Sequence, residues 1–295
     1  MLFLNEDDVR RVLDLDALAE ALRTALRSVS AGTASTPARV GALTGAGLLG
    51  AMPGYVPELG LGAKLVTYFR DNHARGLPGH QALIALFGVE DGVPLVLMGA
   101  THITGIRTAM AAAVAAQALA RPGARSLAVL GAGVQGQAHV TAFTHLFAFD
   151  DVRVAARSAG DSFEDAVRGA DVVCLCTDAD QPVISRSWLG PGTHVSSVGS
   201  GAELDAATLA AGSVFVESRS AATQAFPAGS RELAGRDPQT VTEVGEVLLG
   251  TRPGRQSPDE ITVYKSMGHA SEDVAAAAVV YRAALAAGVG TRISI

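Results

Sequence analysis

The chain has 295 residues, and at a typical ~100–200 residues per domain this length predicts two domains. Its 23 basic and 29 acidic residues give a formal net charge of −6, which argues against nucleic acids and anionic membranes as partners, because both require a concentrated basic surface. With 48% hydrophobic and 18% charged residues, the composition excludes a disordered chain.

The start of the chain and its apolar runs lead us to expect a cytoplasmic protein. The first residues turn acidic at Glu6, unlike a secretory signal. The longest apolar run, residues 109–120, is shorter than the ~20 residues that a membrane span needs. Cys174 and Cys176 lie two positions apart, so on a strand they would face opposite sides and would not pair. Neither a disulfide framework nor a cysteine-rich metal site is expected.

The first hundred residues predict a helix followed by an antiparallel sheet. Asn5 is a candidate N-cap, and the leucines from Leu13 to Leu26 form a rough apolar stripe. Between residues 37 and 96, short apolar runs alternate with Gly and Pro, which is typical of antiparallel strands and their loops. Asp91-Gly92 is a typical hairpin turn within this region.

From residue 108 the pattern changes to alternating helices and strands. An Ala-rich helix is predicted to about residue 120 and another at about 271–287. Apolar strands are predicted at residues 126–130, 152–156, 171–176, 194–199 and 213–217. Apolar strands separated by helices indicate a parallel sheet that is buried on both faces. This part of the chain is therefore expected to be an α/β domain.

A glycine-rich turn directly after the strand 126–130 predicts dinucleotide binding. The run Gly131-Ala132-Gly133-Val134-Gln135-Gly136 opens a helix, which is the context that the dinucleotide fingerprint requires. Gly131 allows the tight turn, Gly133 lets a pyrophosphate approach the backbone, and Gly136 allows close helix–strand packing. The N-terminus of the helix then stabilises the phosphate charge.

The second strand of this domain predicts a preference for NADP(H), with NAD(H) possible. An acidic residue at its end would bind the ribose hydroxyls of NAD. Here the strand ends in Ala155-Ala156-Arg157-Ser158, without an acid, and Arg157 with Ser158 suits a 2′-phosphate. The alternative is that Arg157 is an ordinary solvated surface residue.

The segment after Ser158 is too short for an ordinary nucleotide domain. Only twelve residues, AGDSFEDAVRGA, separate Ser158 from the strand DVVCLC. A crossover helix and a third strand would need ~20 or more further residues. We therefore expect a trimmed half-sheet, a weakened adenine pocket and fewer strands than the usual six.

Three cations stand isolated in apolar or glycine-rich surroundings, at Arg39, Lys64 and Arg107. Lys64 lies inside a strand-like run, where a lysine is unusual unless it is paired or lines a cavity. Three converging cations would suit a small carboxylate substrate, which an arginine binds bidentately. From spacing alone, scattered surface charges are the competing interpretation.

Three histidines, His73, His80 and His102, raise the question of a metal site. They do not have a tight ligand spacing, and no acidic cluster accompanies them. We predict no metal site.

Several segments resemble the ornithine cyclodeaminase/mu-crystallin family over nearly the whole chain. They include AKLVTYF, GLPGHQALIALF, ATHITGIRTAMAAAVAAQALARP, LAVLGAGVQGQAH, PGTHVSSVG, TEVGEVLLG and ITVYKSMGHASEDVAAAAVVY. The resemblance implies an α/β protein in which a Rossmann-type nucleotide domain, trimmed here by the short segment after Ser158, joins an α+β domain for substrate binding and dimerisation. It places the α+β domain at residues 1–108 with 263–295, and the NAD(P)-binding domain at 109–262.

The resemblance also assigns roles to residues of this chain. It implies that the substrate carboxylate is bound by Arg39, Lys64 and Arg107. It implies that the dinucleotide is bound by Thr108, Gly133, Val134, Gln135, Arg157, Ser158, Thr177, Val198, Gly199, Lys265 and Ser266, in addition to Gly131 and Gly136 of the fingerprint. A homodimer acting on a small imine or amino acid that carries a carboxylate is the implied assembly.

Departures from the family pattern decide which reaction is expected. The cyclodeaminase branch resembles this chain but keeps an acid just before the Met-Pro pair and another after the Val-Gly turn, where this chain has Gly50 and Gly201. Cyclodeamination needs acid–base groups to move protons. Mu-crystallin-like ketimine reductases also lack this pair, because a preformed imine needs only a hydride and one proton. Lys64 is the first candidate for positioning or protonating the imine nitrogen. Glu203 is expected to be a solvated charge before a helix, and the alternative is that it substitutes for the missing acid after the Val-Gly turn.

Three functions therefore follow from the sequence. The first is an NAD(P)H-dependent oxidoreductase that reduces a small imine or α-imino acid, or that interconverts amino and imino acids. The second is an ornithine-type cyclodeaminase that releases ammonia. The third is a repurposed ligand-binding protein with a weakened cofactor site, motivated by the missing segment after Ser158.

Overall fold

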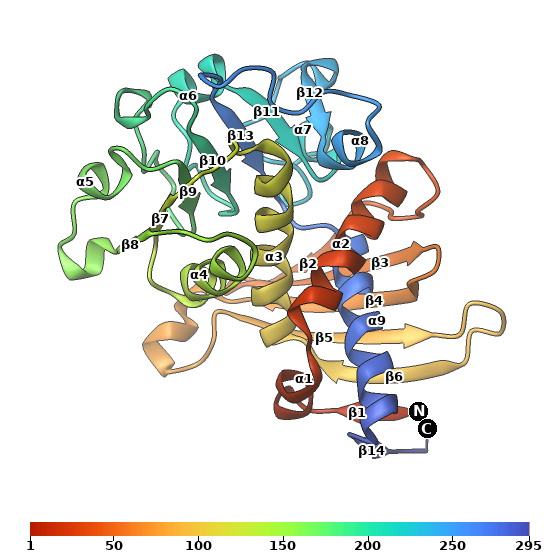
Figure 1. Ribbon diagram of the computed structural model, residues 1–295. Helices are drawn as coiled ribbons and strands as arrows, with labels where there is room; N and C mark the ends of the chain where they lie inside the picture. Colours follow the sequence, from red (N-terminus) through yellow and green to blue (C-terminus); the bar gives the residue numbers. More distant parts are fainter. Residues whose placement is uncertain (295) are drawn as a thin grey trace. The chain divides into compact units, whose positions relative to one another are not determined.

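A computed structural model describes residues 1–294, apart from the side chain of His73, and contains two separate seven-stranded sheets (Figure 1). Each sheet belongs to its own compact unit. The first unit comprises residues 1–107 and 269–295, and the second comprises residues 108–268. The division falls inside one helix, between Arg107 and Thr108.

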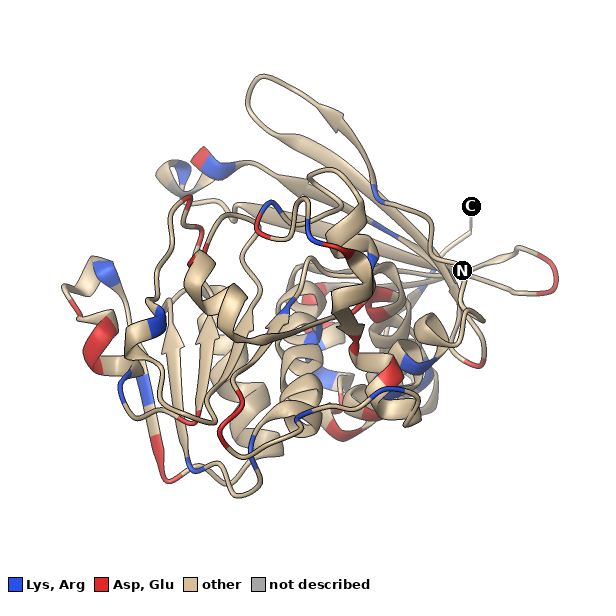
Figure 2. Ribbon diagram, turned by 90° about the horizontal axis from the view of Figure 1, so that it is seen from above, with Lys and Arg blue, Asp and Glu red and all other residues tan. Residues whose placement is uncertain are grey.

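The sheet of the first unit is mainly antiparallel, which confirms the predicted sheet between residues 37 and 96. Its order is β14-β1-β6-β5-β4-β3-β2, with antiparallel pairing from β2 to β6 and parallel pairing of β1 with β6. The strands are β1 (Leu2–Leu4), β2 (Val40–Leu43), β3 (Leu48–Val56), β4 (Gly60–Tyr68), β5 (His80–Phe87), β6 (Pro94–Gly99) and β14 (Thr291–Arg292). Lys64 is the one charged residue within β1 to β6, all of which the structure describes. Figure 2, which colours Lys, Arg, Asp and Glu, shows most of the strand ribbon in tan.

Helices cover one face of this sheet. The helices of the first unit are α1 (Glu6–Val12), α2 (Leu15–Ser30), the first part of α3 (Thr101–Leu119) and α9 (Ala270–Ala287), together with the 3-10 helix η1 (Arg70–Arg75). Asn5 caps α1 as predicted, because its side chain accepts hydrogen bonds from the backbone N–H groups of Asp7 and Asp8. Helices α2 and α9 lie side by side, and α9 packs against β3, β4 and β5 (Figure 1).

Helix α3 begins earlier than the sequence predicts. Its first residue is Thr101, and not a residue near 108. The Glu6 carboxylate accepts hydrogen bonds from the backbone N–H groups of Thr101 and His102, at 2.8 and 3.0 Å. A residue 95 positions away therefore satisfies the start of the helix, and local sequence patterns do not reveal such a cap.

The sheet of the second unit is entirely parallel, as predicted. Its order is β12-β11-β13-β10-β9-β7-β8. The strands are β7 (Ser126–Leu130), β8 (Asp151–Ala155), β9 (Val172–Leu175), β10 (His194–Ser197), β11 (Ser213–Val216), β12 (Val241–Glu243) and β13 (Thr262–Lys265). The expectation of fewer than six strands was wrong, because β12 and β13 are three and four residues long and give weak sequence signals.

Strand β13 also changes where the second unit ends. It pairs with β10 on one side and with β11 on the other, in the middle of the parallel sheet. Residues 263–268 therefore belong to the second unit, and not to the first as expected from the sequence. The free thiols of Cys174 and Cys176 lie at the end of β9 and just after it, and do not pair.

The predicted trimming after Ser158 is present in the structure. The helices of the second unit are α4 (Val134–Leu146), α5 (Phe163–Val167), α6 (Ala206–Ala211), α7 (Ser220–Thr223) and α8 (Val244–Leu249), with 3-10 helices η2 (Arg157–Ala159), η3 (Arg186–Trp188) and η4 (Pro238–Thr240). Only η2 and the five-residue α5 connect β8 to β9, and β8 is the edge strand of the described sheet. None of the helices within residues 1–294 is both long enough and apolar enough to span a membrane.

Candidate functional site

The fingerprint turn of the second unit has a backbone that only glycine can adopt. Gly131 has φ = +114°, and a Cβ atom there would collide with the carbonyl oxygen of Cys176. A Cβ atom on Gly136 would collide with the carbonyl oxygen of Gly131. By contrast, nothing lies within 4 Å of a Cβ built on Gly133, which is the N-cap of the 13-residue helix α4 and has no side-chain cap. This open helix N-terminus fits a pyrophosphate.

The other residues proposed around this turn lie in different environments. Val134 is largely exposed and Gln135 is half-buried at the start of α4. Thr108 is buried within α3. The exposed backbone at Gly133 and Val134 is therefore the accessible part of the fingerprint.

Arg157 and Ser158 lie in η2, directly after β8, and both are exposed. The guanidinium carbon of Arg157 lies 5.1 Å from the centre of the Phe163 ring, which orients the side chain through a cation–π contact. Sequence reasoning missed Asp161, whose carboxylate accepts a 2.9 Å hydrogen bond from the backbone N–H of Ala156. The end of β8 thus carries both an arginine and a carboxylate.

Glu203 is fully buried, so the expectation that it is a solvated charge was wrong. Its Oε1 atom accepts hydrogen bonds from the backbone N–H and the hydroxyl of Thr177, both at 2.7 Å. Its Oε2 atom accepts from the Ser197 hydroxyl and the Gly199 N–H, both at 2.8 Å. With both oxygens engaged in this way, Glu203 is a structural acceptor and not a free acid–base group.

Lys265 and Ser266 are also buried. The Lys265 ammonium donates to Ser197 Oγ at 3.0 Å and to the carbonyl oxygen of Gly199 at 2.7 Å, and it pairs with Glu232 Oε2 at 2.5 Å. These three partners match the three donors of an ammonium. The donors of the Lys265 side chain are therefore all engaged within the protein, and its contact with a dinucleotide stays a prediction. The Ser266 hydroxyl accepts from the N–H of Gly268 at 3.1 Å.

In the first unit, Lys64 and Arg107 converge on two carboxylates at the start of α9. Lys64 Nζ and Arg107 Nε both donate to Asp273 Oδ1, each at 2.8 Å. Arg107 Nη1 pairs with Glu272 Oε2 at 2.5 Å. All four side chains are buried, and Lys64 is 2% exposed. Buried charges of this kind persist when they are paired and hydrogen-bonded.

The charges in this cluster change one another's pKa values. Burial lowers the pKa of Lys64 to about 8, and the nearby positive charges of Arg107 and Arg39 add to this effect against the opposing influence of Asp273. Burial alone would raise the pKa of Asp273, but Arg107 and Lys64 outweigh it and hold that pKa below its usual value. Arg39 influences both groups, so the three predicted cations are brought together.

Sequence reasoning missed the acidic half of this cluster. Glu272 and Asp273 stand in the first turn of α9, where acids are common because they complement the helix dipole. Because acids are ordinary at this position of a helix, their presence there offered no reason to expect that they contact Lys64 and Arg107. The one available signal was that two adjacent acids stand in a helix that is otherwise rich in Ala and Val.

The two glycines that replace the acids of the cyclodeaminase branch differ in the space around them. A Cβ atom on Gly201 would collide with the carbonyl oxygen of Ala179. At Gly50 the nearest heavy atom, Val66 Cγ1, lies 3.5 Å from such a Cβ, which is ordinary contact. The fold therefore excludes a side chain at residue 201 but accepts one at residue 50.

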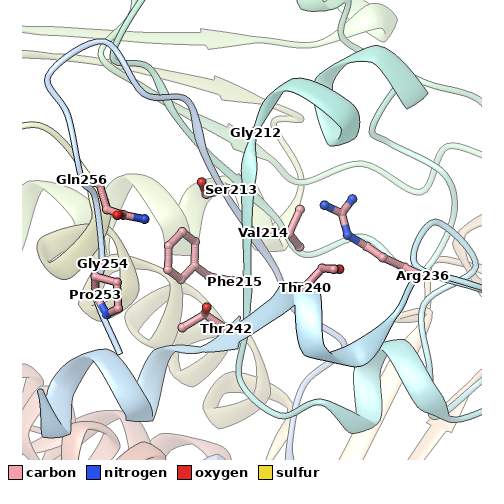
Figure 3. Close-up of a pocket in the computed structure, with 10 residues that line it drawn as sticks. All are labelled: Gly212, Ser213, Val214, Phe215, Arg236, Thr240, Thr242, Pro253, Gly254 and Gln256. Carbon is pink, nitrogen blue, oxygen red and sulfur yellow. The ribbon is translucent and has the colours of Figure 1, made fainter. Parts of the chain in front are cut away.

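A polar pocket of about 300 Å³ lies elsewhere in the second unit (Figure 3). Its lining includes Ser213 at the start of β11, together with Arg236, Thr240 and Gln256. None of the predicted site residues lines it. It lies at the amino ends of β11 and β12, whereas ligands of open parallel sheets bind at the carboxyl ends.

The histidines lie in separate surroundings. The His80 ring lies 4.5 Å from the Tyr68 ring, and His102 Nδ1 lies 3.0 Å from an Arg10 nitrogen. His73 lies outside the described side chains. Among the side chains that the structure describes, no group of three His, Cys, Asp or Glu is placed to hold a metal ion.

Comparisons with known proteins find relatives that match nearly the whole chain. The model of the ornithine cyclodeaminase/mu-crystallin family matches residues 1–160 and 156–288. The ketimine reductase mu-crystallin of Mus musculus is 37% identical over 256 residues, which is 80% of each chain.

Two solved structures have closely similar folds. One is the Δ1-pyrroline-2-carboxylate reductase of Thermococcus litoralis in complex with NADH and L-proline, with a TM-score of 0.91, 28% identity and coverage of 99% of this chain and 100% of that one. The other is an archaeal alanine dehydrogenase dimer with bound NAD, with a TM-score of 0.90, 29% identity and coverage of 100% and 99%. The chain belongs to the ornithine cyclodeaminase/mu-crystallin family.

Proposed function

We propose that the protein is an NAD(P)H-dependent oxidoreductase that reduces a small imine carrying a carboxylate, such as a cyclic α-imino acid, to the amino acid. The observation that carries this proposal is the buried Lys64, which is paired with Asp273 and surrounded by Arg39 and Arg107. The related reductase and ketimine reductase support the same reaction class.

The charge balance of the cluster suits one carboxylate. Three cations, Arg39, Lys64 and Arg107, act on one cluster that contains the carboxylates Glu272 and Asp273, so the cluster is rich in positive charge. A monoanionic imino acid neutralises this charge. A larger polyanion would leave its additional negative charge uncompensated in buried surroundings, which is unfavourable.

The pKa of Lys64 suits proton donation to an imine nitrogen. At neutral pH a lysine with a pKa of about 8 is mostly protonated, yet it gives up its proton far more readily than an ordinary lysine. Asp273 holds the ammonium in place through the 2.8 Å hydrogen bond. The dinucleotide supplies the hydride when it is bound, and the residues that fit it are the open backbone at Gly133 and the loops after β9 and β10.

The cyclodeaminase alternative lacks its acid–base groups here. Gly50 and Gly201 provide no carboxylate, and Glu203 is occupied by four donors. The ligand-binding alternative rests on the missing segment after Ser158, but the fingerprint turn retains the glycine geometry and the open helix end that a pyrophosphate requires.

For the dinucleotide, we propose a preference for NADPH through Arg157 and Ser158. An exposed guanidinium held over Phe163 is well suited to a 2′-phosphate. NADH remains the competing cofactor, because Asp161 places a carboxylate near the same strand end. Two related structures contain NADH or NAD.

We further propose a homodimer that forms through the first sheet. On the face opposite α9, three leucines at Leu49, Leu65 and Leu83 are each 44–46% exposed, and Leu65 pairs directly with Leu83 across β4 and β5. A contiguous exposed apolar surface of this kind marks an interface. The occupant is a second copy of this chain, and a cytoplasmic location is part of the same proposal.

Consumption of NADPH or NADH with cyclic imino acids tests the proposed reaction. Purified protein is mixed with either dinucleotide and with Δ1-pyrroline-2-carboxylate or its six-membered homologue, and nicotinamide absorbance is followed. We expect absorbance to fall, and Lys64→Met to abolish turnover while dinucleotide binding persists.

Other outcomes identify the alternatives. Ammonia release from ornithine with catalytic NAD would establish the cyclodeaminase. If a calorimetric titration detects binding of neither dinucleotide, the result would support the ligand-binding alternative.

A further inference from the structure

A ring of buried charges lies at the carboxyl ends of three neighbouring strands in the second unit. Glu203, Lys265 and Glu232 form it, and their side chains are almost completely inaccessible to solvent. Thr177 follows β9, Gly199 follows β10, and Lys265 ends β13. These positions coincide with the edge at which open parallel sheets bind their ligands.

Glu203 connects two loops that are separate in sequence. One carboxylate oxygen accepts both donors of Thr177, and the other accepts the Ser197 hydroxyl and the Gly199 N–H. A Cβ atom on Gly199 would lie 2.5 Å from the Glu203 Cδ atom, so the loop closes tightly around the carboxylate. Charge-assisted hydrogen bonds of this kind are about twice as strong as neutral ones.

Glu232 and Lys265 complete the ring. Glu232 Oε1 accepts from the backbone N–H groups of Glu203 and Leu204 at 2.6 and 2.7 Å. Its other oxygen pairs with Lys265, which in turn donates to Ser197 Oγ and to the carbonyl oxygen of Gly199. The N–H and the C=O of Gly199 are therefore each held by a different buried charge.

We infer that Glu203 is a positioning residue that holds the loops after β9 and β10 in the conformation that binds the dinucleotide. This rests on the proposed function, because Thr177, Val198 and Gly199 are among the residues proposed to contact it. A carboxylate is required because all four partners are donors. A glutamine would turn one oxygen into an N–H group that faces other donors.

Asp171 provides a matched control at the opposite end of the same sheet. It is also a buried carboxylate that joins two segments, because its Oδ2 accepts from the N–H groups of Arg125 and Ser126 at 2.7 and 3.0 Å. It precedes β9 and therefore lies at the amino ends of the strands. A general loss of stability will follow from either variant, but loss of the loop conformation will follow only from the change at Glu203.

The test compares Glu203→Gln with Asp171→Asn in the full chain. Dissociation constants for NADH and NADPH are measured by fluorescence titration, and amide hydrogen exchange is followed at Thr177 and Gly199. We expect Glu203→Gln to weaken dinucleotide binding at least tenfold and to accelerate exchange at both amides. We expect Asp171→Asn to change neither by more than twofold, whatever it does to the melting temperature.

A milder variant keeps the test decisive if Glu203→Gln does not fold. Ser197→Ala removes one donor to Glu203 and one acceptor of Lys265, and we expect a three- to tenfold loss of dinucleotide affinity. A wild-type chain that binds dinucleotide, together with variants that bind it equally well, overturns the inference about Glu203 alone. A wild-type chain that binds neither dinucleotide overturns the proposed function together with this inference.

Discussion

The Nζ atom of Lys64 lies 2.8 Å from the Oδ1 atom of Asp273, although the two residues are 209 positions apart in the chain. The ion pair joins β4 to the first turn of α9 and is almost completely buried. Burial and the charges of Arg107 and Arg39 lower the pKa of Lys64, whereas Asp273 raises it, and the result is a pKa of about 8. The reactivity of the lysine is therefore set by the balance between these neighbours.

Removal of the Asp273 charge will move the pH dependence of the reaction. If Lys64 donates the proton, kcat/KM for imine reduction falls as pH rises through about 8, because the lysine loses its proton there. Asp273→Asn removes an influence that raises the lysine pKa, so the alkaline limb is expected at lower pH. Profiles of kcat/KM against pH for wild type and variant measure the shift.

Glu272→Gln is the control for this prediction. Glu272 pairs with Arg107, whereas Asp273 contacts the Lys64 ammonium directly at 2.8 Å, so the Asp273 charge acts more strongly on the pKa of Lys64. Its variant is expected to keep the alkaline limb near the wild-type position. A limb that does not move in Asp273→Asn would show that another group donates the proton.

Local sequence patterns predicted the glycine turn and the cations of the two sites, but not the residues that these side chains contact. The turn from Gly131 to Gly136 was predictable because its main restrictions are local: Gly131 has a positive φ, and a Cβ atom on Gly136 would meet the carbonyl oxygen of Gly131. The partners of Lys64 were not predictable, because Asp273 meets it only once β4 and α9 pack together. Glu203 stands just before a helix, where a solvated acid is common. Its burial could not be predicted from neighbouring residues, because it depends on the loops after β9 and β10 that fold around its carboxylate.

The two glycines at the cyclodeaminase positions are expected to respond differently to a methyl group. Gly201→Ala places its Cβ against the carbonyl oxygen of Ala179 and should destabilise the protein by about 1–3 kcal/mol. Gly50→Ala meets ordinary contacts and should change stability by less than about 1 kcal/mol. Urea unfolding of both variants measures the difference, and equal stabilities would contradict the steric explanation for Gly201.

Arg157 should decide between the two dinucleotides. Loss of a charge-assisted contact to a 2′-phosphate costs about 1.5–3 kcal/mol, which is roughly tenfold or more in affinity. Arg157→Ala is therefore expected to raise the dissociation constant of NADPH about tenfold and to leave that of NADH within threefold.

Arg168→Ala is the matched control for Arg157. It removes another exposed arginine, which pairs with Glu164 on α5, so the change in net charge is the same. Its affinity for both dinucleotides should equal that of the wild type. If the wild type binds NADH more tightly than NADPH, the proposed contact between Arg157 and a 2′-phosphate is wrong. In that case Asp161 is the candidate that binds the ribose hydroxyls, and Arg157 is an ordinary surface residue.

The exposed leucines of the first sheet should hold the dimer together. Leu65 is 46% exposed, pairs with Leu83, and lies on the face opposite α9. Leu65→Asp would bury a carboxylate without a partner in the interface, which is strongly unfavourable, so the variant is expected to be monomeric. Sedimentation or light scattering at micromolar concentration measures the change.

Leu249→Asp is the control for this prediction. It introduces the same charge at a leucine that is 42% exposed in the second unit, and it should leave the dimer intact. Because Leu65 lies on the strand that carries Lys64 but on the opposite face, dinucleotide binding by the monomer should persist. If both Leu65→Asp and Leu249→Asp form dimers, the interface does not lie at the exposed leucines of the first sheet.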